Sequence, residues 1–241
     1  MATAMRVPAV WASRRRRTVT FEAAAGILAV AITLTQLGDI RQVLTTQSWF
    51  WLMFGVALLA GTQAFIAGRP AGQAPIVICP TICFTFAIQL CWGLGPAIVA
   101  QTAAVAVGAT RLKAGMRGAT WAASHFALAF AAASVVLSVG NPDPFMHHGP
   151  TNVLVDAISV AGAAAAWLLA YGALDAARAR IRRGSQQTTP GSATTNQMLF
   201  NAALLLLSPV LAVTEHVDVG FVPLVVVPLY AVHRMAKLSA Q

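Results

Sequence analysis

Charged residues are scarce in this chain. Only 10% of its 241 residues are Asp, Glu, Lys or Arg, whereas 58% are hydrophobic, and the mean hydropathy is +0.70. A soluble globule of this length needs more polar surface than such a composition supplies. The scarcity of charge therefore excludes an ordinary soluble domain and indicates an integral membrane protein.

Motifs of the common enzyme classes are also missing. The sequence contains no GxxxxGK[ST] phosphate loop, no HExxH metal motif and no GxSxG nucleophile turn. Its seven acidic residues include no pair inside an apolar run that would suit a proton relay. We therefore expect no catalytic residue and no cofactor in this chain.

Cysteine is rare as well. Cys79, Cys83 and Cys91 all fall within one apolar stretch, and the first two share a helix face through their four-residue spacing. An odd count in apolar sequence does not favour a disulfide framework. Buried cysteine usually serves as a small hydrophobic residue, with a soft-metal or redox role as the alternative.

The longest uncharged stretch is the 41 residues between Arg69 and Arg111. A membrane helix needs about 20 residues to cross the hydrocarbon core, so this stretch suits two crossings. Gly93-Leu94-Gly95-Pro96 supplies the turn, because glycine admits unusual backbone angles and proline cannot continue a helix. The stretch predicts a central hairpin of two short helices, about 75–91 and 96–110.

Six further apolar stretches complete the predicted fold, an all-α, polytopic transmembrane bundle. The basic N-terminal tail, 1–17, carries no cleavage site and precedes an uncleaved first helix. A transmembrane domain follows over 18–233, with an outer loop at Gly140–Pro150 and an inner linker at Ser185–Thr195. Residues 234–241 begin a cytoplasmic connecting helix. The eight expected spans are about 18–38, 48–67, 75–91, 96–110, 119–139, 152–174, 196–214 and 219–232.

The basic residues orient these spans. Of the 16 Lys and Arg residues, 15 fall on one side of the eight-span layout, and Arg41 alone falls on the other. The positive-inside rule then places both termini in the cytoplasm and the chain in the plasma (inner) membrane. The basic clusters are expected to meet anionic lipid headgroups of the bilayer rather than nucleic acid. Glu22, one turn into the first span, is expected to reach the Arg14–Arg17 block.

Polar side chains inside the predicted spans are the first candidates for function, because such groups are costly in hydrocarbon. They either hydrogen-bond between helices as packing contacts or line a cavity for a signal or ligand. His125 is the only one that can change its charge near neutral pH. The candidates are Gln63, Gln89, Gln101, His125 and Asn201.

A second set of polar residues is expected on the outer face. Carboxylates and imidazoles together can bind a divalent metal or respond to external pH, although ordinary loop polarity explains them equally. No spacing among them matches a zinc motif, so we assign no metal ligand. The candidates for outer-face sensing are Asp143, His147, His148, Asp156, Glu215, His216 and Asp218, with Asp39 beside them.

Three segments carry a resemblance to a known family: PTICFTFAIQLCWGLGPAIVAQTAA, NQMLFNAALLLLSPVLAV and VPLYAVHRMAKLSAQ. The chain resembles the N-terminal multi-span membrane sensor region of actinobacterial cyclic-di-GMP signalling proteins. In that family the last segment continues as a helix into diguanylate cyclase (GGDEF) and phosphodiesterase (EAL) domains. The resemblance implies a sensory input module, with cytoplasmic catalytic domains in cis if the natural chain continues past Gln241.

The resemblance supplies no catalytic residue, because neither a GGDEF nor an EAL motif occurs in this sequence. It leaves open a homodimer formed through the spans and the connecting helix. Two other functions also stay open. One is a small-solute transporter subunit, similar to the substrate-binding membrane components of vitamin uptake systems, and the other is a structural membrane scaffold.

Overall fold

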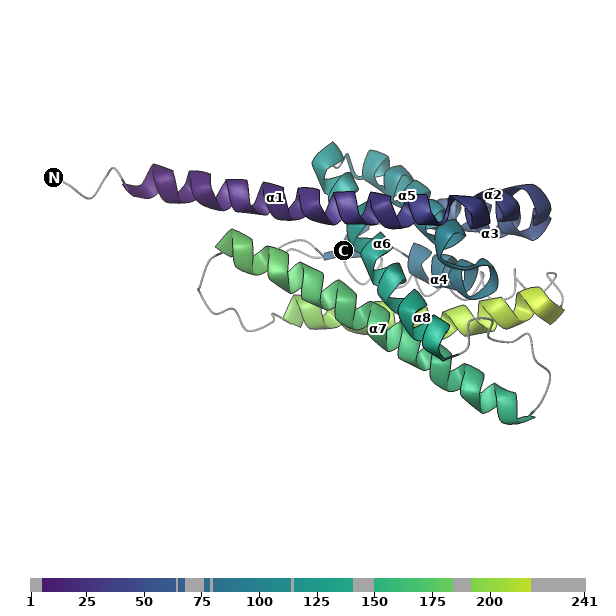
Figure 1. Ribbon diagram of the computed structural model, residues 1–241. Helices are drawn as coiled ribbons and strands as arrows, with labels where there is room; N and C mark the ends of the chain where they lie inside the picture. Colours follow the sequence, from purple (N-terminus) through teal and green to yellow (C-terminus); the bar gives the residue numbers. More distant parts are fainter. Residues whose placement is uncertain are drawn as a thin grey trace.

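The computed structural model describes residues 6–63, 65–67, 76–78, 80–113, 115–140, 150–183 and 192–217, with side chains over most of these ranges. This part of the chain is a bundle of helices with one small β-ribbon (Figure 1). The ribbon pairs β1 with β2 antiparallel, Phe65 opposite Ile78. The elements are α1 (Arg6–Thr35), α2 (Leu37–Thr46), α3 (Ser48–Thr62), β1 (Phe65–Ala67), β2 (Ile76–Ile78), α4 (Thr81–Trp92), α5 (Leu94–Arg111), α6 (Met116–Val139), α7 (Pro150–Arg183) and α8 (Ser192–Val217).

The central hairpin is formed by α4 and α5. Its turn is a single residue, Gly93, whose φ of 86° is readily adopted by glycine alone. The amide of Gly93 donates to the carbonyl of Gln89 and closes α4 before the chain reverses. The predicted break in the uncharged stretch is therefore confirmed at this residue.

Helix α4 lies in the interior of the bundle. Every residue from Thr81 to Leu90 is buried, and the helix packs against α3, α5 and α8. The largest fully buried side chains around it include Phe50, Phe86, Phe130, Trp167 and Leu205, which come from five different helices. The hydrophobic core is thus centred on the helix that the sequence places within the longest uncharged stretch.

The two longest helices, α1 and α7, run in opposite directions (Figure 1) and contact each other. The first residues of α1 and the last residues of α7 lie at the same end, on the left of the view. Both of these helix ends are basic, since they carry Arg14–Arg17 and Arg178–Arg183. Their joint location agrees with the charge clustering on which the orientation was predicted.

Three helices of the described part are long and apolar enough to cross a membrane. These segments are Arg15–Thr35 in α1, Met116–Val139 in α6 and Leu154–Arg182 in α7. Helices α2 and α3 add a fourth if they are taken as one broken span, with a bend of 103° between them. The structure therefore supports a helical membrane protein with three or four such spans, fewer than the eight predicted.

Several predicted boundaries are wrong. The second span was expected to run to Ala67, but α3 ends at Thr62 and Phe65–Ala67 is a strand. The third span was expected to begin at Pro75, but Ile76–Ile78 pairs with that strand and α4 begins at Thr81. An isolated run of apolar, β-branched residues does not distinguish a strand from a helix. The all-α prediction therefore missed this ribbon.

Differences of the same kind occur elsewhere. Asp39 and Arg41, expected on the outer face between the first and second spans, lie within helix α2. The inner linker was predicted to continue to Thr195, yet α8 already begins at Ser192. Helix α7 continues beyond the expected end of the sixth span to Arg183. The predicted eighth span and the connecting helix, 219–241, lie outside the described residues.

Helices α3 and α5 approach each other closely at Gly61. A Cβ atom on this residue would lie 2.6 Å from the carbonyl oxygen of Ala104, which is part of a helical backbone and cannot turn aside. On the same helix, Gly55 has nothing within 4 Å of such an atom. The two glycines therefore separate the effect of helix contact from the effect of helix propensity.

We predict that Gly61→Ala destabilises the protein by about 1–3 kcal/mol, the usual range for overpacking a tight contact. Gly55→Ala should be neutral or stabilising, by up to about 1 kcal/mol, because alanine favours a helix over glycine. Unfolding of both variants in the same mild detergent measures the difference. Equal stability of the two variants would contradict the close approach of α3 and α5.

Candidate functional site

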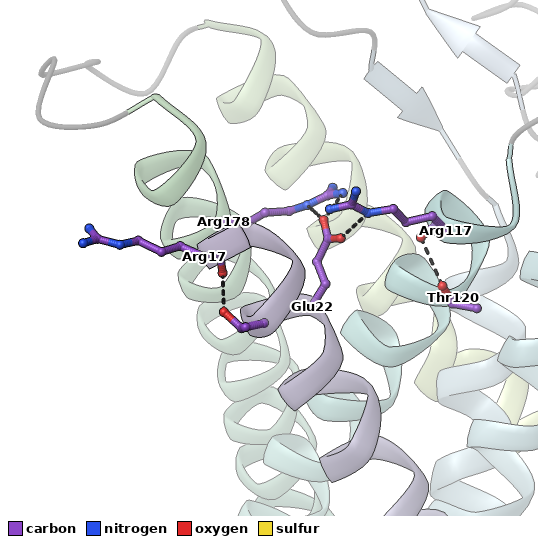
Figure 2. Close-up of polar contacts among 6 residues, drawn as sticks. Arg17, Glu22, Arg117, Thr120 and Arg178 are labelled. Atoms are coloured by element: carbon purple, nitrogen blue, oxygen red, sulfur yellow. Dashed lines mark hydrogen bonds and ion pairs between the residues drawn. The ribbon is translucent and has the colours of Figure 1, made fainter. Parts of the chain in front are cut away.

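The strongest polar contact among the described residues joins three helices at their basic end. Glu22 on α1 accepts hydrogen bonds from Arg117 on α6 and Arg178 on α7 (Figure 2). Nε of Arg117 lies 2.7 Å from Oε2 of Glu22, and Nη2 of Arg178 lies 2.7 Å from Oε1. We call Glu22, Arg117, Arg178 and the neighbouring Trp121 the Glu22 cluster.

Burial makes the two ion pairs unequal. The side chain of Glu22 is 9% exposed, that of Arg178 is 22% exposed and that of Arg117 is 52% exposed. Solvent screens an exposed pair strongly and leaves it a small net contribution. Arg178 also places its guanidinium 4.6 Å from the centre of the Trp121 ring, a cation–π contact. Arg178 is therefore the stronger partner of Glu22.

The expected partner of Glu22 was wrong. We predicted that it would reach the Arg14–Arg17 block, but Glu22 pairs with Arg117 and Arg178, whereas Arg15, Arg16 and Arg17 are exposed. The carbonyl of Arg17 instead accepts a hydrogen bond from Thr20. The arginines that precede Glu22 on α1 compete poorly for its carboxylate with the two guanidinium groups that α6 and α7 bring to it.

A stack of aromatic rings continues from the Glu22 cluster between α6 and α7. His125 lies one turn after Trp121 on α6, and its ring stacks on Tyr171 with centroids 4.1 Å apart and planes at 12°. Tyr171 stacks in turn on Trp167 at 5.0 Å and 8°. We call this the aromatic seam; it comprises His125, Tyr171, Trp167, Phe126 and Phe130.

His125 is held by a hydrogen bond as well as by stacking. Its Nε2 lies 2.8 Å from the carbonyl oxygen of Tyr171. A carbonyl can only accept, so the ring donates through Nε2. His125 is buried, at 4% exposure, and both of its contacts lead to α7. The residue therefore connects two helices.

The central hairpin contains a second polar contact. Oε1 of Gln101 on α5 lies 2.7 Å from the hydroxyl of Thr85 and 3.1 Å from that of Thr81, both on α4. Farther along α4, Nε2 of Gln89 donates to the carbonyl of Phe130 on α6 at 2.9 Å. Polar side chains thus bind α4 to α5 and to α6.

The candidates predicted inside the spans fall into two groups. Gln89, Gln101, His125 and Asn201 are buried, and the first three bond to a neighbouring helix. Gln63 instead follows the end of α3 and donates to the adjacent Thr62 hydroxyl. Two roles were predicted for these residues, packing contacts between helices and the lining of a cavity. The contacts of Gln89, Gln101 and His125 match the packing role.

The outer-face candidates are not brought together within the described residues. Asp156 is buried on α7 at 2% exposure, and Asp39 is exposed on α2. The side chains of Asp143, His147, His148, Glu215, His216 and Asp218 lie outside the described residues. Where side chains are described, no three His, Cys, Asp or Glu residues are grouped so that they could hold a metal ion.

Sequence reasoning missed Arg117, Arg178, Trp121, Trp167 and Tyr171. The four-residue spacings of Trp121 with His125 and of Trp167 with Tyr171 are visible in the sequence and put each pair on one helix face. The partners of Glu22 leave no such trace, since they lie 95 and 156 positions away.

Comparison with protein-family models, curated proteins and solved structures found no match. The geometry alone therefore indicates what this site can do. The Glu22 cluster fixes the basic ends of α1, α6 and α7, and the aromatic seam continues the α6–α7 contact away from them. These contacts hold α1, α6 and α7 together.

We predict a fixed order of destabilisation in the Glu22 cluster. Glu22→Gln removes the charge that neutralises two arginines and should cost most, about 1.5–3 kcal/mol, the range for hydrogen bonds to charged groups. Arg178→Gln should cost less than Glu22→Gln but more than Arg117→Gln, because Arg117 is the most exposed of the three. Thermal unfolding in one detergent at low and at high salt checks the order. A larger loss for Arg117→Gln than for Arg178→Gln would contradict it.

Proposed function

We propose that this chain is a membrane-embedded input module that relays an external or membrane signal to a cytoplasmic cyclic-di-GMP synthesising or degrading output. The observation that carries the proposal is the packing of α4 against α8. Helix α4 is the buried centre of the bundle, and α8 is the last described helix before the predicted connecting segment. A change in the position of α4 therefore acts directly on the helix nearest to the output.

The relay divides the bundle into a fixed and a movable part. The fixed part is α1, α6 and α7, which the Glu22 cluster and the aromatic seam join. The movable part is the α4–α5 hairpin with α8. Its buried apolar contacts include Leu204 and Leu205, and its hydrogen bonds to the fixed part include those of Gln89 to the Phe130 carbonyl and of Gln197 to the Tyr171 hydroxyl. A ligand shifts such an arrangement only if it binds the two states with different affinity.

The proposal includes an orientation. The remaining apolar helices α4, α5 and α8 lie in the plasma membrane with the three long spans, as in the eight-span layout, and both termini face the cytoplasm. The basic ends of α1 and α7 support this orientation because lysine and arginine collect on the cytoplasmic side. In this layout the signal would leave through 219–232 and the connecting helix, in one chain or in a homodimer.

A graft onto a diguanylate cyclase output domain tests the relay. Leu205→Ala opens a cavity at a side chain that is 1% exposed. It should change cyclic-di-GMP production by about 2- to 30-fold, the range for mutations that alter coupling by 0.5–2 kcal/mol. Leu206→Ala is the matched control. Leu206 is the next residue on α8 and is 71% exposed, so this substitution should leave cyclic-di-GMP production unchanged.

A helix-breaking substitution completes the test. Ala236→Pro interrupts the connecting helix and should abolish the difference between Leu205→Ala and the parent graft. The relay is refuted if all three variants produce as much cyclic-di-GMP as the parent while remaining folded in the membrane.

A small-solute transporter subunit is the second candidate function. It is favoured by the polar contact that Gln101 of α5 makes with Thr81 and Thr85 of α4, a buried helix of only 12 residues. Short helices near the membrane centre are a feature of transporter binding sites. Copurification of a small solute together with a partner ATPase would support this function over the relay, and recovery of the chain without either would favour the relay.

A further inference from the structure

Three buried polar atoms, one each on α4, α7 and α8, have no hydrogen-bond partner in the described part of the protein. They are Oε1 of Gln89, Nε1 of Trp167 and Nδ2 of Asn201. Their residues are 3%, 0% and 4% exposed. Burying a polar atom without a partner is unfavourable, so each of these atoms calls for an explanation.

The register of α7 against α8 places two of the atoms at one level. Nε2 of Gln197 on α8 donates to the Tyr171 hydroxyl on α7 at 3.1 Å. Trp167 lies four residues before Tyr171, and Asn201 lies four residues after Gln197. Because α7 and α8 run in opposite directions (Figure 1), both steps lead one helical turn the same way. Trp167 and Asn201 therefore lie at the same height between the two helices.

Gln89 on α4 is linked to Trp167 through Phe130 of α6. Its Nε2 is bonded to the carbonyl of Phe130, and the ring of Phe130 meets that of Trp167 edge-on with centroids 6.0 Å apart. Phe86, one turn before Gln89, stacks on the same Phe130 ring. The carboxamide of Gln89 is thereby held beside the phenylalanine that also packs on Trp167.

One hydroxyl oxygen has the hydrogen-bonding capacity to satisfy all three atoms. Trp167 Nε1 and Asn201 Nδ2 are donors, and Gln89 Oε1 is an acceptor. A hydroxyl oxygen accepts two hydrogen bonds and donates one, and therefore satisfies all three. The core residues nearby are apolar, among them Phe86, Phe130 and Leu205, so a charged group would be disfavoured.

We infer that α4, α7 and α8 form a binding site for one neutral hydroxyl group, which accepts from Trp167 and Asn201 and donates to Gln89. A single water molecule is the smallest ligand with this chemistry, since buried waters typically make about three hydrogen bonds. The hydroxyl of a small membrane-soluble alcohol has the same chemistry. The site does not depend on the proposed cyclic-di-GMP output.

The indole N–H of Trp167 reports on this site. Protein labelled with ¹⁵N-indole tryptophan in detergent micelles gives one indole signal per tryptophan, and Trp167→Phe identifies that of Trp167. We expect a cross-peak between the Trp167 N–H and water, lost in Asn201→Leu and in Gln89→Met. Gln197→Leu is the matched control: it removes a polar contact one turn away and should leave the cross-peak in place.

Native mass spectrometry distinguishes the two sources of the hydroxyl. A missing water cross-peak together with a retained small alcohol, lost in Asn201→Leu, would support the site with an alcohol as its ligand. The absence of both signals would overturn the inference. A water cross-peak that persists unchanged in folded Asn201→Leu and Gln89→Met would also overturn it, because the oxygen would then not be held by the three residues.

Discussion

The burial of α4 on all sides is the constraint on which the rest of this structure depends. A helix that exposes no residue from Thr81 to Leu90 must be enclosed by other helices, and its polar side chains must find partners among them. Gln89 and Thr85 do so by bonding to α6 and α5. The one-residue turn at Gly93 supplies the nearest of the enclosing helices, α5.

A second interaction holds the outer part of the bundle. The Glu22 carboxylate accepts from arginines of two other helices, so one acidic residue joins the middle of α1 to the start of α6 and to the last turns of α7. Arg178 adds its contact with Trp121, from which the aromatic seam continues between α6 and α7. The long helices are therefore fixed by directional contacts, whereas α8 meets α4 mainly through apolar side chains. This contrast is the physical basis for proposing that α8 moves with the α4–α5 hairpin.

Much of the helical organisation could be predicted from the sequence, because it follows from local chemistry. The hairpin break depends on four adjacent residues, and the burial of Gln89, Gln101, His125 and Asn201 follows from their positions in apolar runs. The ribbon of Phe65–Ala67 and Ile76–Ile78 could not be predicted, since such short apolar strands look like helix within a long uncharged stretch. The pairing of Glu22 could not be predicted either, because it depends on how distant helices pack. Within the described residues three or four helices are long and apolar enough to cross, fewer than the spans predicted there, because hydropathy counts apolar stretches and does not show how long a helix each of them forms.

The length of α4 has a consequence for how the protein experiences its bilayer. With 12 residues, α4 is about 18 Å long, well short of the roughly 30 Å of hydrocarbon that a spanning helix must match. Its residues Thr81–Leu90 are enclosed by protein, whereas exposed large apolar side chains lie on the surrounding helices, α1 and α7 among them. A thinner or thicker membrane would tilt the long helices, and their packing would carry that tilt to the centre. The position of α4 would therefore respond to the thickness of the membrane and not to the chemical identity of its lipids.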